Sequence, residues 1–384
     1  MAQKSGVYIT STPVEEIVES TSNGISRKQY YHVKTFGDTG FKMEIVNPRP
    51  ERSMLIHKFM RLSPIPMPTP SDEMIKRVAT HDFMYIRNDR IMSGYFYMLV
   101  KRAKKMNPHM KVVLEIPTYP YENETTDLTF KQRIHLFNDH LWRRDFIACV
   151  DRIATYSRDD MIWGVPTIRF SNAIDFEHCK RGKVLETLED KTIEIIACAQ
   201  ITFWHGYDRA LKGLVDYYKN SKKRKYDIVL HVVGDGPKKN NPLDSYRAIV
   251  RDAGLEDKVI FHGRLVGAEL EAIYNRCVIG LDSMGRHRSG VFYNSSLKGK
   301  EYLAKGLIIV SGVQTELDYD ESYPYYFRVA ADDSNVDFFS ILEKVDKLMS
   351  ENGLGAIQRA IMSYAKENFD YGVAMKGVIE YVDS

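Results

Sequence analysis

Short apolar runs rich in β-branched residues recur along the whole chain, and a longer stretch with helical periodicity separates each run from the next. This alternation is typical of parallel sheets whose strands are joined by crossover helices. The expected strands are Val7–Thr10, Lys42–Val46, Phe83–Ile86, Lys111–Ile116, Arg152–Tyr156, Thr167–Phe170, Ile193–Ala199, Ile228–Val233, Val259–Phe261, Ile279–Leu281 and Leu307–Val310. The pattern therefore predicts an α/β fold.

The alternating runs form two series, which predicts two tandem Rossmann-like, doubly wound domains in the 384 residues. We expect the first domain over residues 1–175, the second over 176–365, and over 366–384 a C-terminal helix that returns to the first domain. The segment Ser171–Lys180 is the expected linker. Ligands of such sheets bind beyond the carboxyl ends of the strands. We therefore expect the two domains to face one another across a ligand-binding cleft.

The composition is that of a globular protein, with 44% apolar residues, 27% charged residues and a formal net charge of +3. That net charge is too small to indicate nucleic-acid binding. Basic residues cluster in 101–111 and 221–225. Solvated helix ends explain both clusters, and an anionic membrane surface is the alternative for the first.

Cys149, Cys179, Cys198 and Cys277 are scattered without paired spacing. This predicts free thiols in a reducing compartment and argues against a structural zinc site. The N-terminus has no apolar signal core, and no run approaches the roughly 18 residues needed to span a bilayer. We expect a cytoplasmic protein, with peripheral contact at the inner face of the membrane as the alternative location.

The segment Asn294–Val310 is the most informative for function. Small polar residues form a turn, an amphipathic helix follows, Gly306 closes it, and a buried strand comes next. Such a turn points unpaired backbone N–H groups outward at the positive end of a helix dipole, which suits a phosphate. Glu301, about one turn into the helix, could reach a pair of sugar hydroxyls. An ordinary turn before an ordinary helix is the alternative interpretation.

Loops of unusual composition follow the other strands of the second half. They are Thr202–Lys212, the glycine turn Gly234–Pro237, Phe261–Leu265 and Asp282–Gly290. Glycine permits the sharp turns that these strand ends require. Arg286 and Arg288 could neutralise a diphosphate through their guanidinium groups. Each loop alone is compatible with a structural turn, and it is their placement at successive strand ends that favours a binding site.

The order of these loops resembles the C-terminal domain of a retaining GT-B glycosyltransferase of the broad family 4 type. The matching motifs are Gly234–Pro237, Val259–Gly263, Asp282–Ser296, Glu301–Gly306 and Ile308–Val310. The resemblance covers residues 193–312. It implies a GT-B architecture and binding of a nucleoside-diphosphate sugar in the second half of the chain.

The resemblance also implies residue roles. Glu301 would bind the donor ribose, and backbone N–H groups of the turn before the helix would hold the diphosphate. The turn after Val259–Phe261 would line the nucleobase pocket, and Gly236 lies in the glycine turn of the donor site. The residues of the two turns are Ser295, Ser296, Leu297 and Lys298 for the diphosphate, and Gly263, Arg264 and Leu265 for the base.

Two positions depart from the family pattern. The family often has two glutamates eight positions apart, but Tyr293 stands eight residues before Glu301. The usual phosphate-binding Lys-Gly after the first strand of the domain is here His205-Gly206. Arg209, Lys212 and Arg264 are therefore candidates for compensating charge, the first two also as catalytic residues. His205 is either a phosphate-binding residue or a buried, hydrogen-bonded core histidine.

In the first half, Ser22–Gln29 contains Gly24 and Ile25 and resembles the first loop of GT-B N-terminal domains, which faces the transferred sugar. The loop Glu115–Glu122 follows an apolar strand and carries two prolines and two tyrosines, which would suit a carbohydrate acceptor. Glu115 is the candidate catalytic or orienting residue there. A simple chain reversal and a solvated carboxylate are the respective alternatives.

The resulting prediction is a metal-independent glycosyltransferase of hexosyltransferase type that uses a UDP- or GDP-linked sugar and no other cofactor. Asp318-Tyr-Asp320 mimics a metal-binding acid pair but is expected at the surface, and no metal site is predicted. By resemblance, the acceptor is a glycan or lipid-linked glycan, the configuration is retained, and the pathway is cell-surface polysaccharide synthesis.

Two alternatives from other classes stay open. A nucleotide-sugar epimerase on the same scaffold would bind the same donor without an acceptor. A non-catalytic nucleotide-sugar-binding protein would bind the donor without turnover. A nicotinamide-dependent dehydrogenase is disfavoured because no Gly-x-Gly-x-x-Gly follows a strand.

Overall fold

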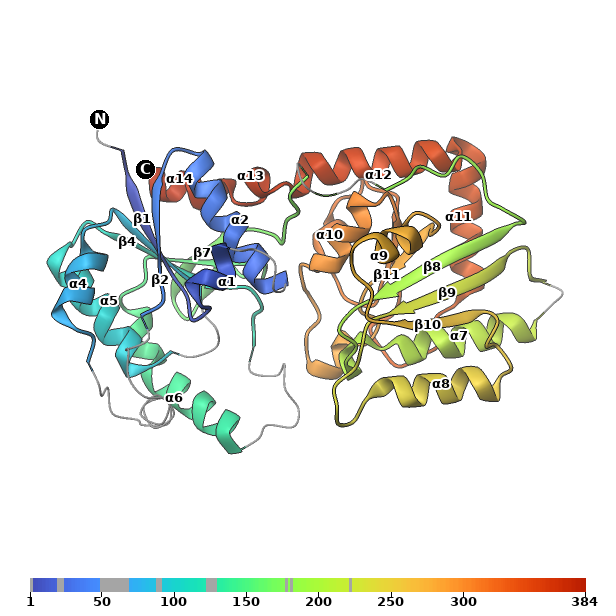
Figure 1. Ribbon diagram of the computed structural model, residues 1–384, viewed down its shortest axis with the longest axis horizontal. Coiled ribbons are helices and arrows are strands. Elements are labelled where there is room, and N and C mark those ends of the chain that lie inside the picture. Colours follow the sequence, from blue (N-terminus) through green and yellow to red (C-terminus); the bar gives the residue numbers. More distant parts are fainter. Residues whose placement is uncertain are drawn as a thin grey trace. The chain divides into compact units, whose positions relative to one another are not determined.

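The computed structural model describes residues 3–18, 24–48, 69–87, 92–121, 130–176, 179, 182–220 and 223–384. The chain divides into two compact units (Figure 1), which we call the N-terminal unit (residues 1–171 and 371–384) and the C-terminal unit (residues 172–370). The chain passes from the N-terminal unit to the C-terminal unit after residue 171 and returns after residue 370. The sequence predicted these boundaries after residues 175 and 365. The last residues of the chain thus belong to the first unit.

The N-terminal unit is built on a sheet with the strand order β2-β1-β3-β4-β5-β7-β6. Its strands are β1 (Ser5–Ile9), β2 (Lys42–Val46), β3 (Phe83–Arg87), β4 (Lys111–Ile116), β5 (Arg152–Thr155), β6 (Met161–Ile162) and β7 (Val165–Arg169). Neighbouring strands are parallel except β6 and β7, which pair antiparallel at the edge. Central strands are buried on both faces, so β1 is a continuous apolar run in which Val7, Tyr8 and Ile9 are fully buried.

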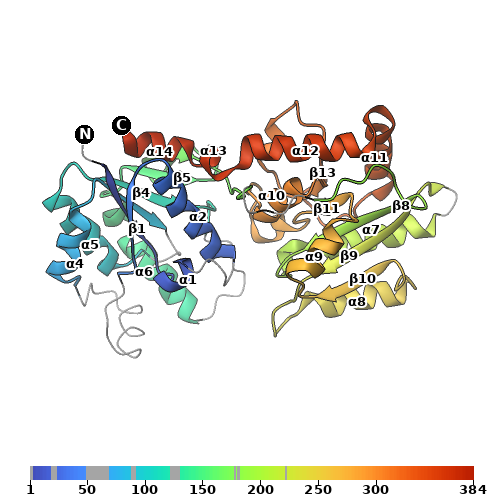
Figure 2. The same ribbon diagram turned by 45° about the horizontal axis from the view of Figure 1, so that its top comes forward.

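Helices cover both faces of this sheet. They are α1 (Val14–Val18), α2 (Gly24–Asp38), α4 (Asp72–Ala79), α5 (Gly94–Met106), α6 (Phe130–Ile147), α13 (Tyr371–Ala374) and α14 (Lys376–Asp383). Figures 1 and 2 show α4, α5 and α6 on one face and α2 with α13 and α14 on the other. Serine caps fix two of the helix starts: Ser71 Oγ accepts from Met74 N (3.1 Å) and Ser93 Oγ from Phe96 N (3.4 Å).

The C-terminal unit has a fully parallel sheet in the order β10-β9-β8-β11-β12-β13. Its strands are β8 (Thr192–Cys198), β9 (Asp227–Val233), β10 (Val259–Gly263), β11 (Ile279–Leu281), β12 (Ile308–Ser311) and β13 (Tyr326–Arg328). The chain leaves β8 toward β9 and β10, then returns to the other side of β8 at β11. Strand order therefore reverses between β8 and β11, which is where parallel sheets of this type bind ligands.

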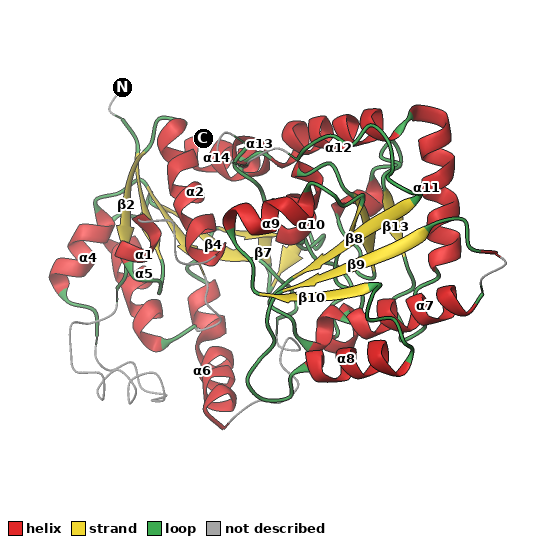
Figure 3. Ribbon diagram, turned by 45° about the vertical axis from the view of Figure 1, so that its right-hand side comes forward, coloured by secondary structure: helices red, strands yellow, loops and turns green. Residues whose placement is uncertain are grey.

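Helices flank this sheet as well. They are α7 (Tyr207–Lys219), α8 (Pro242–Asp252), α9 (Gly267–Tyr274), α10 (Leu297–Ala304), α11 (Phe338–Asn352) and α12 (Leu354–Phe369). Figure 3 shows α7 and α8 along one face of β8, β9 and β10, and α9 and α10 on the opposite face. The described loops also contain the short 3-10 helices η2 (Phe203–His205), η4 (Arg286–Ser289) and η5 (Glu316–Tyr319).

Every strand expected from the sequence is present, with ends that differ by at most two residues. The C-terminal helix expected over 366–384 is divided, since α12 ends at Phe369, α13 spans Tyr371–Ala374 and α14 spans Lys376–Asp383. The expected series lacked β6 and β13, which are two and three residues long. Such short edge strands carry too few residues to produce an alternating pattern. Within the described parts of the chain, no helix is both long enough and apolar enough to cross a membrane.

Candidate functional site

The loops that follow the strands of the C-terminal sheet are joined to one another by backbone hydrogen bonds. Ile201 N, after β8, donates to Asp235 O (2.8 Å), after β9. Gly234 N donates to Gly263 O (2.7 Å), at the end of β10. A third bond spans the point between β8 and β11 where the strand order reverses: Met284 N, in the loop after β11, donates to His205 O (2.7 Å), in the loop after β8. The strand ends therefore form one connected surface at the carboxyl edge of the sheet.

Two glycines allow the loops after β8 and β11 to touch. Gly206 has a φ of +62°, and a Cβ atom on it would lie 2.4 Å from Gly285 N. A Cβ atom on Gly285 would in turn lie 2.9 Å from Gly206 Cα. Only glycine allows the two backbones to approach this closely. The close approach of the two loops therefore explains why a glycine follows His205 in the sequence.

The turn before α10 forms a capped helix N-terminus. Ser296 is the N-cap, and its Oγ accepts from Gly299 N (3.2 Å) and donates to Asp282 Oδ1 (2.8 Å). The N–H groups of Leu297 and Lys298 lie in the first helical turn, where helix geometry supplies no intrahelical acceptor. These two amides lie at the positive end of the helix dipole. They are the backbone groups from which an anion site can be made.

The Lys298 side chain is held by a buried carboxylate. Its Nζ donates to Asp282 Oδ1 (2.6 Å) and Ser283 Oγ (2.7 Å), and the side chain is 16% exposed while that of Asp282 is 1% exposed. Burial opposes ionisation of Asp282, but the Lys298 ammonium and the Ser296 hydroxyl outweigh it and lower the pKa of the carboxyl. The ammonium is thus fixed in place beside the first turn of α10.

His205 is buried and neutral, and it lies in the same surroundings. Thr202 N donates to its Nδ1 (2.9 Å), so we assign the ring proton to Nε2. Burial, with the nearby charges of Lys298 and Arg286, lowers the pKa of His205 to about 2. At neutral pH the ring is therefore a neutral N–H donor where a lysine was expected. Both interpretations of the sequence, a core histidine and a phosphate contact, are compatible with this geometry.

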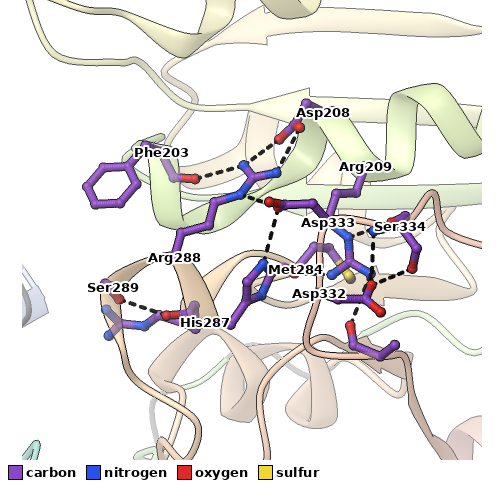
Figure 4. Close-up of polar contacts among 12 residues, drawn as sticks. Phe203, Asp208, Arg209, Met284, His287, Arg288, Ser289, Asp332, Asp333 and Ser334 are labelled. Carbon is purple, nitrogen blue, oxygen red and sulfur yellow. Dashed lines mark hydrogen bonds and ion pairs between the residues drawn. The ribbon is translucent and has the colours of Figure 1, made fainter.

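Arg288 has a different environment from the one expected (Figure 4). Its guanidinium makes a bidentate ion pair with Asp208 (2.8 and 2.9 Å), and its Nε donates to Asp333 (2.7 Å). These carboxylates raise the pKa of Arg288 above its ordinary value, Asp208 most strongly. The side chain ties η4 to the first turn of α7 and to the loop before α11. A diphosphate could reach this guanidinium only by displacing one of the two aspartates.

Arg209 is likewise occupied by the protein. It is 1% exposed and donates from Nε to Ser334 O (2.7 Å), from Nη2 to Ala330 O (3.0 Å) and from Nη1 to Met284 O. Burial lowers the pKa of the guanidinium. Arg209 therefore positions the loop after β11, and the structure gives it this supporting role next to the site. Its catalytic role stays a prediction.

Five further candidates of the C-terminal unit lie in two different places. Lys212 is half exposed and lines a different cavity, a groove of about 700 Å³ between α7 and α8, so the structure does not bring it to α10. Gly236, Gly263, exposed Arg264 and half-buried Leu265 lie in the strand-end loops after β9 and β10. A Cβ atom on Gly236 would overlap Asn241 Oδ1 at 1.9 Å, which explains that glycine by packing.

Glu301 and Ser295 lie on either side of the α10 cap. After burial, the Glu301 carboxylate is the strongest influence that raises the pKa of Cys198, to about 11, and of Tyr274. The carboxylate therefore acts on groups at the end of β8 and at the end of α9. Ser295 Oγ instead donates to Glu316 (2.8 Å) and accepts from Asn172 N (3.0 Å), so its side chain braces the turn. Arg286 lies with its guanidinium 5.7 Å from the Trp204 ring centroid.

In the N-terminal unit, Glu115 is the centre of a buried charged network. Its carboxylate accepts from Lys28 Nζ (3.0 Å), Tyr85 Oη (3.1 Å) and the Arg87 guanidinium, and it is fully buried. Burial opposes its ionisation, but Arg87 and Lys28 hold the pKa of Glu115 well below its usual value. Burial also lowers the pKa of Lys28 to about 8 and that of His32 to about 3.

Gly24 and Ile25 form the exposed start of α2 in the N-terminal unit. The preceding Ser22 and Asn23 lie outside the described residues, as does Glu122 of the expected acceptor loop. Asp318 and Asp320 of the metal-like pair make local bonds, to Thr315 N (2.7 Å) and Ser322 N (3.0 Å) respectively. The two acids therefore act as turn and cap acceptors here.

The structure adds residues that the sequence did not single out. Asp282 was expected only as part of a loop, Asp208 only as part of Thr202–Lys212, and Lys28 only as part of Ser22–Gln29. Arg87 and His32 of the Glu115 network were not expected at all. A charged residue in a helix or at a strand end is usually solvated, so no sequence signal separates these from ordinary surface residues.

No protein-family model matches the chain, and the comparison with curated proteins finds no matching sequence. Solved structures do match over the whole chain. A glycosyltransferase from Rickettsia africae is 12% identical over 100% of this chain and 98% of that one, with a TM-score of 0.62. HepE from Anabaena in complex with UDP is 11% identical over 99% of both chains, with a TM-score of 0.57.

Sucrose-phosphate synthase from Thermosynechococcus elongatus is similar as well, at 10% identity over 99% of both chains and a TM-score of 0.59. At such identities the likeness shows the fold alone. The chain has the GT-B glycosyltransferase fold, with one Rossmann-like sheet in each of its two units. The fold predicted from the resemblance of the loops is therefore confirmed.

Proposed function

We propose that the chain is a glycosyltransferase that moves a sugar from a nucleoside-diphosphate sugar to a carbohydrate or lipid-linked acceptor. The observation that carries the proposal is the N-terminus of α10, where first-turn amides and Lys298 lie at the carboxyl edge of a parallel sheet in a GT-B fold. The loop with neutral His205 is bonded to the adjacent loop after β11. Ligands of parallel α/β sheets bind at that edge. HepE, which has the same fold, forms complexes with UDP and UDP-glucose.

The donor diphosphate would lie against the first turn of α10. The N–H groups of Leu297 and Lys298 and the helix dipole would face its oxygens. Lys298 would add a cation whose position Asp282 and Ser283 already fix. The His205 Nε2–H would supply a neutral hydrogen bond where the resemblance implies a lysine. Glu301, one turn further along α10, would accept hydrogen bonds from the ribose hydroxyls.

Catalysis would come from these fixed groups. As the bond between sugar and phosphate breaks, negative charge grows on the diphosphate. Dipoles and cations that are already in place stabilise that charge without reorganisation. We propose a transfer that needs no metal ion and retains the anomeric configuration. Trehalose-6-phosphate synthase, of the same fold, is an enzyme of glycosyl transfer with retention.

The acceptor would be bound by the N-terminal unit, at the exposed start of α2 that carries Gly24 and Ile25. We propose a glycan or lipid-linked glycan of a cell-surface polysaccharide. A lipid-linked acceptor would bring the protein to the inner face of a membrane. WaaB, also similar in fold, is a lipopolysaccharide outer core galactosyltransferase.

A donor screen tests the proposal directly. Thermal shift and calorimetry with UDP, GDP and their common sugars should show stabilisation by one nucleotide, with UDP expected. Glu301→Ala should then weaken donor binding by more than tenfold, about 1.4 kcal/mol or above, because the ribose loses its carboxylate. Glu269→Ala, an exposed glutamate on the neighbouring α9, is the matched control and should bind as the wild type does.

Two results would overturn the assignment. A flat thermal shift with every nucleotide and nucleotide sugar would remove the donor site. Conversion of the donor to its epimer when no acceptor is present would replace transfer with epimerisation. Unchanged donor affinity in Glu301→Ala would remove the ribose contact alone.

A further inference from the structure

A cluster of metal-ligating side chains lies in the C-terminal unit, on strands that precede the loops described above. Glu194 is on β8, His231 is on β9, and Cys277 is in the connection from α9 to β11. Their ligand atoms, a carboxylate oxygen, an imidazole nitrogen and a sulfur, all lie within 4.8 Å of one another. His231 and Cys277 are fully buried, and the Glu194 side chain is 23% exposed.

Strand register explains why these residues meet. In the parallel pairing of β8 with β9, Glu194 is opposite Val229 and Ile196 is opposite His231. Because side chains alternate between faces, Glu194 and His231 lie on the same face of the sheet. Val278 N donates to Glu194 O (2.9 Å), which fixes Cys277 in the segment just before β11. Two neighbouring strands and the segment that leads into a third thus converge on one point.

We propose that Glu194, His231 and Cys277 bind a divalent zinc ion that links β8, β9 and the segment just before β11. Thiolate, imidazole and carboxylate are ligands that Zn²⁺ accepts in a tetrahedral site, with water in the fourth position. Ligand atoms bound about 2.0–2.3 Å from one tetrahedral ion are separated by about 3–4 Å. Rotamer adjustments of about 1 Å would bring the present atoms to that spacing.

A cation already takes part in this cluster. Arg276 Nε lies 3.0 Å from Glu194 Oε2, and its Nη2 lies 3.3 Å from His231 Nε2. The His231 nitrogen and the Glu194 oxygen are only 2.8 Å apart. The Arg276 side chain is 53% exposed, so it can turn into solvent when an ion enters. The Cys277 thiol would release its proton to solvent, and the two ligand charges would balance Zn²⁺.

The second ring nitrogen of His231 is also placed for this role. His231 Nδ1 lies 2.9 Å from His262 Nε2, on β10. A histidine that binds metal through Nε2 donates its Nδ1–H to an outer partner, which fixes the ring and its tautomer. His262 is such a partner. The scattered cysteines of the sequence argued against zinc, but this site takes its ligands from separate strands and needs no local spacing.

Cobalt binding tests the site on the full-length chain, without any sugar nucleotide. Protein stripped with a chelator under reducing conditions should bind Co²⁺ with a near-ultraviolet thiolate charge-transfer band, and Zn²⁺ should abolish that band and raise the Tm. Cys277→Ser should lose the band, whereas Cys149→Ser, in the other unit, should keep it. Arg276→Gln, at an exposed position, should bind Co²⁺ about tenfold more tightly because the competing cation is gone.

The outcomes decide the proposal. Absence of a thiolate band in the wild-type protein, or a band of equal intensity in Cys277→Ser, would overturn it. So would an Arg276→Gln variant that binds Co²⁺ no more tightly than the wild type. This last variant keeps the test informative if Cys277→Ser does not fold, since its substitution is at the surface.

Discussion

The N-terminal and C-terminal sheets both gather charge near the carboxyl ends of their strands, but they enclose it to different extents. Around Glu115, the carboxylate is 0% exposed and the side chains of Lys28 and Arg87 are 7% and 10% exposed. Around Asp282, the carboxylate is 1% exposed, but Lys298 is 16% exposed. The first network is closed on itself, while the second is open toward solvent at its cation.

The difference in exposure distinguishes charged groups that stabilise the fold from charged groups that can bind a ligand. A buried carboxylate with several donors holds α2, β3 and β4 together, and removal of one partner leaves the others uncompensated. At α10, in contrast, helix amides and a partly exposed ammonium lie side by side, which is an arrangement that an anion can enter. The same kinds of side chain thus serve opposite purposes in the two units.

The closed network should give the largest effect. Glu115→Gln is expected to lower the free energy of unfolding by about 3–5 kcal/mol, because Lys28 and Arg87 stay buried without their counter-ion. Urea denaturation measures the loss. Glu44→Gln is the matched control in the same unit: Glu44 is 31% exposed and pairs with Arg77, so its loss is expected at about 0–1 kcal/mol. Equal effects of the two variants would contradict the claim that enclosure makes the Glu115 network costly to break.

Acid pH should give the next largest effect. His205 has a folded pKa of about 2 and an ordinary pKa near 6.5. Between these values only the unfolded chain binds the proton, so stability falls as the pH decreases below about 6.5. The slope approaches about 1.4 kcal/mol per pH unit well below pH 6.5, and the total loss between pH 6.5 and pH 5 is about 1.6 kcal/mol. His205→Gln should remove this dependence from the C-terminal unit.

Hydrogen exchange, which reports each unit separately, can measure this slope. His32→Gln is the counterpart in the N-terminal unit, where burial lowers the pKa of His32 to about 3. Each variant should flatten the acid dependence of its own unit only. An unchanged acid slope in His205→Gln would mean that the folded ring is protonated at moderate pH, and the neutral donor assigned to the site would be wrong.

Arg288→Lys should give the smallest effect, and it tests whether this cation of the C-terminal unit stabilises loops or binds a ligand. The bidentate bond to Asp208 is lost while the charge stays, so we expect a loss of about 0.5–1 kcal/mol in unfolding free energy. Donor affinity should change by less than threefold, because the guanidinium braces loops instead of holding a diphosphate. Calorimetry with the nucleotide identified in the donor screen measures this affinity. A loss above tenfold, at unchanged stability, would restore the diphosphate contact expected from the sequence.

Much of the fold could be predicted from the sequence alone. Apolar runs buried on both faces of a parallel sheet, such as Ile193–Ala199, are distinct from the amphipathic helices between them, so strands and their order along the chain are readable. The turn before Glu301 was readable too, because a serine N-cap and the residues after it define a helix start locally. Strands as short as Met161–Ile162 were not, because two residues show no periodicity.

The donor-side candidates show where local reasoning ends. Arg209, Arg288 and Lys212 have the same formal charge in the sequence, yet one is buried under carbonyls, one is clamped by aspartates and one lines a separate groove. Which partner each cation meets depends on contacts between segments that are far apart in the chain. The same holds for Glu194, His231 and Cys277, whose ligand atoms converge only through strand register.

The class of fold, the strands and the helix start at residues 295–298 follow from the amino-acid sequence, since each depends on neighbouring residues and on their pattern of burial. Which charges are compensated inside the protein, and which stay available at a surface, depends on how distant segments pack. The reason is physical: the free energy of a charge depends on its desolvation and its partners, and both are set by packing across the sheet.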